Sequence, residues 1–269
     1  MTPEEHAARV IDWWAMRDEK LRDPNGWLTL VGLHWLKPGE NRFGADASND
    51  IVLSGPDVPA HAGALQLTDG EVRLRYAAEE LRDEPLVTDR AGEPTVIQLG
   101  TLHMYVIQRG ERRALRVRDH DSPAVAAFRG MDHFPIDPSW RIEGRLVPST
   151  PGEKIEIVDV TGDVGSEATP GTVRFERDGR EWSIAALPGD VDKRNLWLVF
   201  GDASNGQETY GGGRFVYTEP LGDDGSVVID FNIAYNPPCV FSPFATCPLP
   251  PPENRLPIPI QAGERSFGP

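Results

Sequence analysis

The densest group of residues able to do chemistry lies between Asp202 and Arg214. This stretch is rich in hydroxyl, amide and carboxylate side chains, and three consecutive glycines precede the strand that begins at Arg214. Glycines at such a place allow a positive φ angle and a close backbone approach. The stretch lacks a Lys-Ser or Lys-Thr after its glycines and has no βαβ surroundings, so it matches neither a P-loop nor a dinucleotide fingerprint. We interpret it as a tight loop that brings Asp202, Tyr210 and Arg214 together.

A second polar group follows the alternation of the last predicted strand, residues 226–235. One face of this strand is apolar and predicted to be core, while Asp230, Asn232 and Asn236 line up on the other face. A wide hairpin turn joins it to the strand at residues 214–218, which places Arg214 opposite Asp230 or Asn232. The polar row is either a cross-strand ion pair worth about a few tenths of a kcal/mol or the lining of a pocket.

Cys239 and Cys247 lie in a proline-rich stretch, residues 235–252, that we predict to be an ordered, extended coil. No Cys-x-x-Cys and no paired histidine spacing accompany them, so no metal site is predicted. In a reducing compartment they are expected to be thiols. A reactive thiolate would need a nearby cation, for which Arg214 is a candidate; otherwise the two cysteines are inert buried thiols.

These residues must be positioned by a chain that is mainly β. Residues 4–22 form the one clear helix, which Thr2 can cap, and Trp13 and Trp14 are expected to pack it onto the body. From Trp27 onward, short apolar runs are interrupted by turn residues every 8–12 positions, with no helical pattern between them. This spacing predicts β-sandwich or barrel-like sheets and a proline-rich C-terminal coil.

The predicted organisation has three parts. Residues 1–25 form a helix on the body, residues 26–85 a small β-sandwich-like region, and residues 86–269 a larger β domain closed by the proline-rich segment. The charged run at residues 79–85 marks an approximate domain boundary, which we place between about residues 80 and 95. The alternative is one continuous unit.

Charge and composition exclude several classes of function. The 269-residue chain carries a net charge of −15, which disfavours nucleic acid and anionic membrane surfaces as partners. No stretch approaches the about 18 apolar residues of a membrane-spanning helix, and the N-terminus lacks the features of a signal peptide. A cytoplasmic protein is therefore expected, with no predicted cofactor; the oligomeric state is not predicted.

Several phrases together resemble a bacterial family of proteins of unknown function, DUF1684. The most specific one runs from Asp230-Phe231-Asn232 through Tyr235-Asn236-Pro237-Pro238-Cys239 to the end of the proline-rich stretch. The matching segments are residues 17–20, 26–36, 41–53, 116–119, 133–135, 202–214 and 230–256. The resemblance implies one unit over nearly the whole chain and brings no activity, cofactor or catalytic residue.

Residues 41–70 also resemble a forkhead-associated phosphothreonine reader, which is a β-sandwich. The family's first arginine is replaced by Ala45, Pro59 and Ala60 stand where its phosphate-binding serine should be, and Asp69 replaces an asparagine. The resemblance therefore implies a shape without phosphopeptide binding.

Two functions follow as hypotheses. The first is a hydrolase-type enzyme that binds a small molecule in a pocket of the C-terminal sheet. Its catalytic candidates are Asp202, Asp230 and Cys239, and its ligand-binding candidates are Tyr210, Arg214, Asn232, Tyr235 and Cys247. The second is a non-catalytic binding or scaffold module that uses the sandwich-like region.

Overall fold

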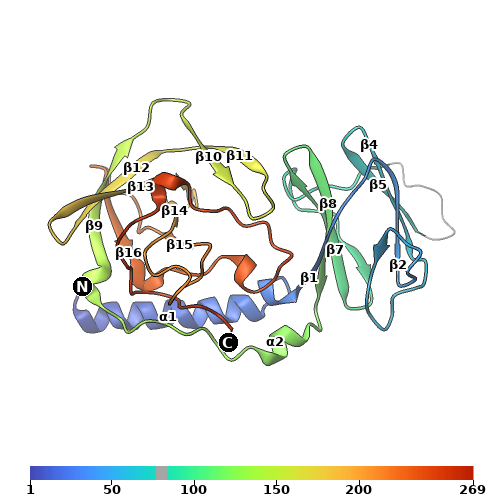
Figure 1. Cartoon of the computed structure of the whole chain (residues 1–269), viewed down its shortest axis with the longest axis horizontal. Coiled ribbons are helices and arrows are strands. Elements are labelled where there is room, and N and C mark those ends of the chain that lie inside the picture. Colours follow the sequence, from blue (N-terminus) through green and yellow to red (C-terminus); the bar gives the residue numbers. More distant parts are fainter. Residues whose placement is uncertain (77–83, 269) are drawn as a thin grey trace. The chain divides into compact units, whose positions relative to one another are not determined.

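The computed structural model describes residues 1–76 and 84–268 and divides the chain into two units (Figure 1). Unit 1 comprises Met1–Lys20 and Arg129–Pro269, and unit 2 comprises Leu21–Phe128. Most of the charged run expected to mark a boundary, residues 79–83, lies outside the described residues. The division falls near residue 128 because the strands between residues 97 and 119 pair with the strand at residues 30–35 and complete the sheets of unit 2.

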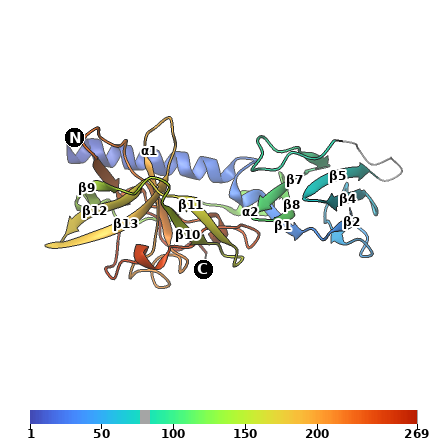
Figure 2. The same cartoon turned by 90° about the horizontal axis from the view of Figure 1, so that it is seen from above.

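The predicted N-terminal helix is α1 (Pro3–Arg22), and its cap is the predicted one. Thr2 Oγ1 accepts a hydrogen bond from the Glu5 amide (3.2 Å), and the Thr2 amide donates to Glu5 Oε2 (2.7 Å). This reciprocal capping box satisfies two backbone donors at the start of the helix. The Trp14 indole donates to the Asn232 carbonyl (3.0 Å), so this part of α1 packs on unit 1 as expected (Figure 2).

Unit 1 is built on a six-stranded antiparallel sheet that curls into a half-barrel, with strand order β15-β14-β13-β12-β9-β16. A separate hairpin, β10–β11, follows β9. The core lies within the curl, where the Phe231 ring contacts those of Phe200, Phe175 and Trp140. The strands are β9 (Arg141–Pro148), β10 (Lys154–Val158), β11 (Val164–Ala168), β12 (Gly171–Arg177), β13 (Arg180–Pro188), β14 (Leu196–Phe200), β15 (Arg214–Tyr217) and β16 (Ser226–Asp230). Short 3-10 helices are η2 (Pro138–Trp140), η3 (Phe231–Ile233), η4 (Pro238–Val240) and η5 (Pro252–Asn254).

The predicted register between the last two strands is wrong, although the two predicted segments do meet in one antiparallel bridge between Phe215 and Tyr235. β15 and β16 are at opposite ends of the strand order, so Arg214 lies opposite Phe200 and Asp230 lies opposite Arg141. The last strand also stops earlier than expected, because the Asp230 side chain accepts a hydrogen bond from the Asn232 amide and caps η3. Asp230 therefore ends the strand, Asn232 lies in the 3-10 turn and Asn236 follows that turn, so the three residues do not share a sheet face.

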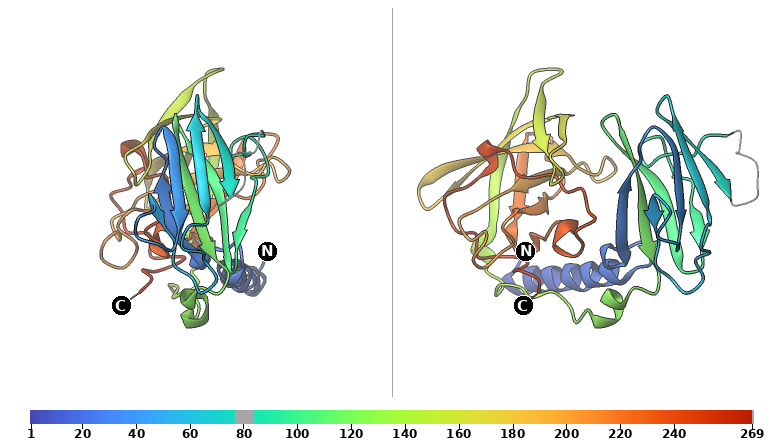
Figure 3. Two further views of the ribbon diagram at one scale, coloured as in Figure 1. Left: turned by 90° about the vertical axis from the view of Figure 1, so that its right-hand side faces the viewer. Right: turned by 45° about the vertical axis from the view of Figure 1, so that its right-hand side comes forward.

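Unit 2 is a β-sandwich of two four-stranded sheets, with strand orders β1-β8-β7-β6 and β3-β2-β4-β5 (Figure 3). Phe43 and Leu65 from one sheet share a core with Met104 and Leu115 from the other. The sandwich thus extends well beyond the range predicted for it. Its elements are η1 (Trp27–Thr29), β1 (Leu30–Trp35), β2 (Gly39–Gly44), β3 (Ile51–Val52), β4 (Gly63–Thr68), β5 (Glu71–Tyr76), β6 (Ile97–Leu99), β7 (Leu102–Arg109), β8 (Arg112–Asp119) and α2 (Pro123–Ala127).

The mainly β prediction is confirmed. Among the described residues, no helix has both the length and the apolar character needed to cross a membrane.

Candidate functional site

Arg214 is a fully buried charged residue of unit 1, with a side-chain exposure of 0%. Its Nη2 donates to Asp202 Oδ2 (2.9 Å) and to the Ile260 carbonyl (2.7 Å). Its Nη1 donates to the carbonyls of Ala262 (2.5 Å) and Glu264 (3.2 Å). The expected role as an anchor for an anionic ligand is therefore corrected, because the chain itself uses the guanidinium. We call Arg214, Asp202 and the three carbonyls the Arg214 centre.

Asp202 is equally enclosed, and both of its carboxylate oxygens are occupied. Oδ2 accepts from Arg214, while Oδ1 accepts from the Ser204 amide (2.9 Å), the Ser204 hydroxyl (2.5 Å) and the Ile260 amide (3.1 Å). Such a carboxylate orders its own loop and the C-terminal segment. The geometry does not support the expected acid–base role for Asp202.

The polar row that begins at Asp230 also serves the fold. Asp230 Oδ2 lies 2.6 Å from His6 Nε2, and Oδ1 accepts from the backbone and side-chain amides of Asn232. Asn232 in turn makes two hydrogen bonds, each 2.9 Å long, with the backbone of Asp137. Asn232 and Asn236 are buried. The row therefore holds the N-terminal helix and a neighbouring loop, which is a structural role and not the ligand-binding role of the first hypothesis.

Tyr235 has a packing role. Its ring lies 5.8 Å from Trp13, 5.7 Å from Phe215 and 6.2 Å from Tyr217, and the Arg17 guanidinium lies 4.9 Å from its centroid. Burial raises the pKa of its hydroxyl, and Tyr217 adds to this effect. The side chain is thus a neutral part of an aromatic cluster.

Sequence reasoning missed the residues of α1 that complete these polar centres. His6 pairs with Asp230, and Arg17 Nε donates to Glu264 Oε1 (3.2 Å), whose side chain is fully buried. A signal was present: His6, Val10, Trp13 and Arg17 recur at the spacing of one helix face. His6 and Arg17 can form ion pairs, so this face of the helix predicts polar as well as apolar contacts with the body.

The remaining three predicted residues do meet. Cys239 and Cys247 are thiols whose side chains are hydrogen-bonded, and Cys239 also shares a hydrogen bond with the Tyr210 hydroxyl. The Cys239 amide donates to Cys247 Sγ at 3.0 Å. Cys247 is buried, whereas Cys239 and Tyr210 are half-buried. We call these three residues the thiol cluster.

The glycine loop positions Tyr210 in this cluster. A side chain on Gly213, whose φ is +89°, would place its Cβ 2.5 Å from Pro250 Cγ. A Cβ on Gly212 would lie 2.4 Å from the Tyr210 ring. The absence of both atoms lets the loop approach the proline-rich coil, which is the close backbone approach that the run of glycines predicts.

The proline-rich coil positions the two cysteines. Cys239 lies in η4, one short turn of helix that follows Pro237, and Cys247 lies in an extended segment. The Cys247 carbonyl accepts a hydrogen bond from the Val160 amide (2.9 Å), which ties this segment to the chain after β10. The coil is therefore folded back on itself, so residues eight apart in sequence come into contact.

The environment lowers the pKa of the Cys239 thiol to about 7. The main cause is the hydrogen bond from Cys247, and the Tyr210 hydrogen bond adds to it, while burial opposes both. Burial and the neighbouring Cys239 raise the pKa of Tyr210, which therefore stays protonated and able to donate. The lowering arises from hydrogen bonds and not, as predicted, from Arg214.

The histidines of unit 1, His6 and His133, are engaged elsewhere. His6 faces Asp230, and the His133 ring stacks on Trp14 with centroids 3.9 Å apart. Burial lowers the pKa of His133 to about 4. An imidazole that is neutral and stacked in this way supports packing.

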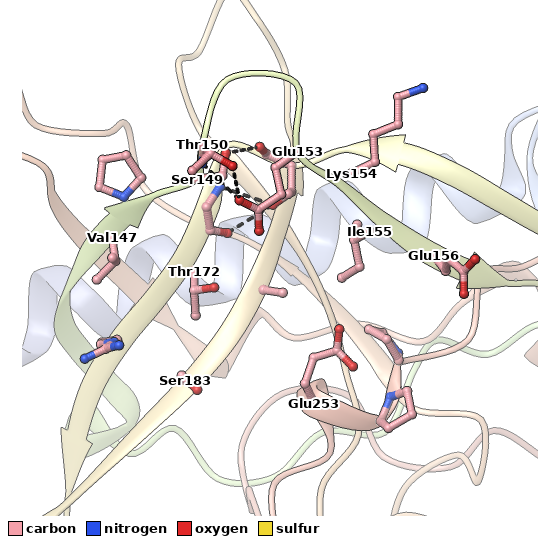
Figure 4. Close-up of a pocket in the computed structure, with 17 residues that line it drawn as sticks. Val147, Ser149, Thr150, Glu153, Lys154, Ile155, Glu156, Thr172, Ser183 and Glu253 are labelled. Atoms are coloured by element: carbon pink, nitrogen blue, oxygen red, sulfur yellow. Dashed lines mark hydrogen bonds between the residues drawn. The ribbon is translucent and has the colours of Figure 1, made fainter.

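A groove of about 730 Å³ lies on the sheet of unit 1 and is bounded by β9, β10, β12, β13 and the coil near η5 (Figure 4). None of the eight predicted site residues lines it, although Pro251 and Pro252 of the coil do. The Thr150 amide and hydroxyl both donate to Glu153 Oε2 (3.0 and 2.8 Å). The polar residues that line the groove include Ser149, Thr150, Glu153, Thr172, Ser183 and Glu253.

Comparisons with known proteins identify a family without a known activity. Residues 126–265, just over half of the chain, match the family "Protein of unknown function (DUF1684)". A solution NMR structure of an uncharacterized protein from gene locus rrnAC0354 of Haloarcula marismortui is 32% identical, with a TM-score of 0.44. The match covers 53% of this chain and 80% of that one. No curated protein matches the chain.

Proposed function

We propose, from the premise that this chain belongs to the DUF1684 family of proteins of unknown function, that it acts through a nucleophilic thiolate at Cys239. One observation carries the proposal: the Cys239 thiol is half-buried and hydrogen-bonded to both Cys247 and Tyr210. The polar groups of the other candidates form hydrogen bonds within the protein. The thiol cluster is therefore the place where a small molecule can meet a reactive group.

The chemistry of a thiol depends on its ionised fraction. An ordinary cysteine has a pKa near 8.5, so only a few per cent is thiolate at pH 7. With a pKa of about 7, roughly half of Cys239 is thiolate at neutral pH. Two hydrogen-bond donors hold that charge without an ion pair, which leaves the sulfur nucleophilic.

Cys239 is the nucleophile here, as in the hydrolase hypothesis, but its partners are Cys247 and Tyr210 and not Asp202 or Asp230. A hydrolase of the cysteine type pairs its nucleophile with a base, usually histidine. Asp202 is paired with Arg214, and His6 faces Asp230. The surroundings of Cys239 therefore favour direct attack by a thiolate on an electrophile over base-assisted hydrolysis.

The test is the pH dependence of alkylation of the full-length, reduced protein by iodoacetamide, with the modified residue identified by peptide mass spectrometry. We expect Cys239 to react first, with a rate that rises through a midpoint near pH 7, because the thiolate is the reacting form. Tyr210→Phe removes one donor and should move the midpoint upward. Tyr217→Phe is the matched control, since Tyr217 stacks on Tyr235.

A midpoint for Cys239 at the value of an ordinary cysteine would overturn the proposal. So would equal reaction of Cys239 and Cys247 in the folded protein, because their different burial predicts selectivity.

The groove on the sheet supports a second proposal, that unit 1 binds a small polar molecule there. Its volume suits a small ligand, and its hydroxyl and carboxylate groups can accept or donate hydrogen bonds. A fragment library screened by ligand-observed NMR should yield hits that Ser183→Trp abolishes, because the indole fills the groove. Hits that survive this change would place binding elsewhere.

The binding or scaffold hypothesis for the sandwich of unit 2 stays a prediction, as does its forkhead-associated likeness. Its test is whether a partner binds the full chain and is lost on substitution of surface residues in unit 2.

A further inference from the structure

We infer that Cys239 and Cys247 are a dithiol that a hydroperoxide oxidises to an intramolecular disulfide. This inference rests on the proposed nucleophilic role of Cys239 and names the substrate class and the product. It starts from a feature that simple nucleophilic catalysis does not require, the second thiol in contact with the first.

The two sulfurs are already neighbours in the folded chain. The Cys247 thiol is hydrogen-bonded to that of Cys239, and the Cys239 amide lies 3.0 Å from Cys247 Sγ. Both cysteines belong to one folded-back coil, which brings them into contact. The chain contains no other cysteine, so no further thiol competes for either sulfur.

The two thiols differ in the way a two-step oxidation requires. Cys239 is half-buried, has a second hydrogen-bond donor in Tyr210 and holds the thiolate, so it is the sulfur that meets an external oxidant. Cys247 is 2% exposed and touches Cys239, so it meets the oxidised sulfur and little else. This asymmetry assigns Cys239 as the attacking and Cys247 as the resolving cysteine.

The atoms and electrons balance in two steps. The Cys239 thiolate attacks the terminal oxygen of ROOH, an S–O bond forms, the O–O bond breaks, and RO⁻ leaves and takes up, through solvent, the proton that the Cys239 thiol released on ionising. Cys239 is then a sulfenic acid, S–OH. Cys247 sulfur attacks Cys239 sulfur, the S–S bond forms, the S–O bond breaks, and the hydroxide leaves as water with the Cys247 proton. Overall, two thiols and ROOH give one disulfide, ROH and H₂O, so the peroxide is reduced and the thiols are oxidised.

This chemistry needs no group that the cluster lacks. A peroxide has a weak O–O bond, and the nucleophile is already ionised, so the thiolate can attack it without a histidine base. The Tyr210 hydroxyl lies at the sulfur where the oxygen is transferred. A hydroperoxide therefore fits the site better than an amide, whose cleavage requires protonation of the amine leaving group.

The experiment treats the reduced full-length protein with one equivalent of H₂O₂ after the reductant has been removed. We expect the intact mass to fall by about 2 Da as two thiol protons are lost. Peptide mapping should then show a Cys239–Cys247 bridge. Cys247→Ser should stop at the first step, with a dimedone-reactive sulfenic acid on Cys239. Cys239→Ser should slow consumption of H₂O₂ at least about tenfold, because the remaining thiol is buried.

The outcomes separate this inference from the proposed function. If Cys239 alkylates with a midpoint near pH 7 but H₂O₂ leaves both thiols reduced, or drives Cys239 to sulfinic acid without a bridge, the inference fails and the proposed function stands. If Cys239 alkylates like an ordinary cysteine, the proposed function itself fails. Circular dichroism of each serine variant checks that the fold is retained.

Discussion

The Arg214 centre and the thiol cluster are both built from the glycine loop and the C-terminal chain, yet their polar groups are used in opposite ways. In the Arg214 centre, a guanidinium and a carboxylate with 0% side-chain exposure neutralise each other and bind the backbone. In the thiol cluster, hydrogen bonds and no ion pair lower the pKa of a half-buried thiol. Residue types that suggest chemistry therefore acquire a structural or a reactive role from their surroundings.

The two sites differ in how completely their polar groups are hydrogen-bonded and in whether a ligand can reach them. A buried charge is tolerated when a partner and hydrogen bonds replace its water, and such a group is then unavailable to a ligand. A thiolate tolerates partial burial with fewer partners, because sulfur is large and polarisable. The contrast predicts that substitutions in the Arg214 centre affect stability and that substitutions in the thiol cluster affect reactivity.

The largest effect is expected for Arg214→Met, which leaves Asp202 charged and buried and leaves three carbonyls without their donor. Breaking such a buried pair costs about 3–5 kcal/mol of unfolding free energy, measured by urea denaturation. Arg174→Met is the control on the same sheet, since Arg174 is exposed and faces Glu181 at 3.5 Å. It should change stability by less than about 0.5 kcal/mol. Equal effects of the two substitutions would break the comparison.

A smaller effect is expected from His133, a half-buried titratable group that, unlike Arg214, is not held in an ion pair with any described residue. Burial lowers its pKa from an ordinary 6.5 to about 4, and nearby Asp132 offsets part of this. The unfolded chain therefore binds the proton more tightly than the folded chain. Stability is retained above pH 6.5 and should fall by roughly 1–2 kcal/mol between pH 6.5 and 4, a range that allows for its partial exposure.

Urea denaturation at several pH values measures this effect, and His133→Gln should remove it. The informative quantity is the difference between the pH slopes of the two proteins, since other groups contribute equally to both. Identical slopes would show that His133 is not held neutral by the fold.

Of the two centres, the thiol cluster should show the smaller effect on stability: Cys239→Ser should change the unfolding free energy by less than about 1 kcal/mol. The side chain is half-buried, and serine, although smaller, keeps a group that can donate and accept hydrogen bonds. The same substitution should abolish alkylation at this position. A loss of stability similar to that of Arg214→Met would instead show that the thiol cluster is structural and would contradict the predicted difference between the two centres.

Much of the fold could be predicted from local patterns. Thr2 caps α1, the apolar alternation after Trp27 indicates strands, and the glycines before Arg214 allow a close approach. The predicted meeting of Arg214 with Asp202 is present in the structure, although it serves the fold. The pairing of β15 with β14 and of β16 with β9 could not be predicted, because each strand is locally compatible with several neighbours.

The sequence by itself determined the N-terminal helix, the mainly β character and the proline-rich coil that holds both cysteines, because short-range sterics and burial periodicity act within a few residues. Only the tertiary structure decided which polar groups are satisfied. The Arg214 guanidinium binds carbonyls up to 50 residues away, and Asp230 meets His6 across 224 residues. The contact of Tyr210 with Cys239 likewise joins two segments of the chain. Such contacts depend on the strand order and on the path of the C-terminal chain, which no local pattern specifies.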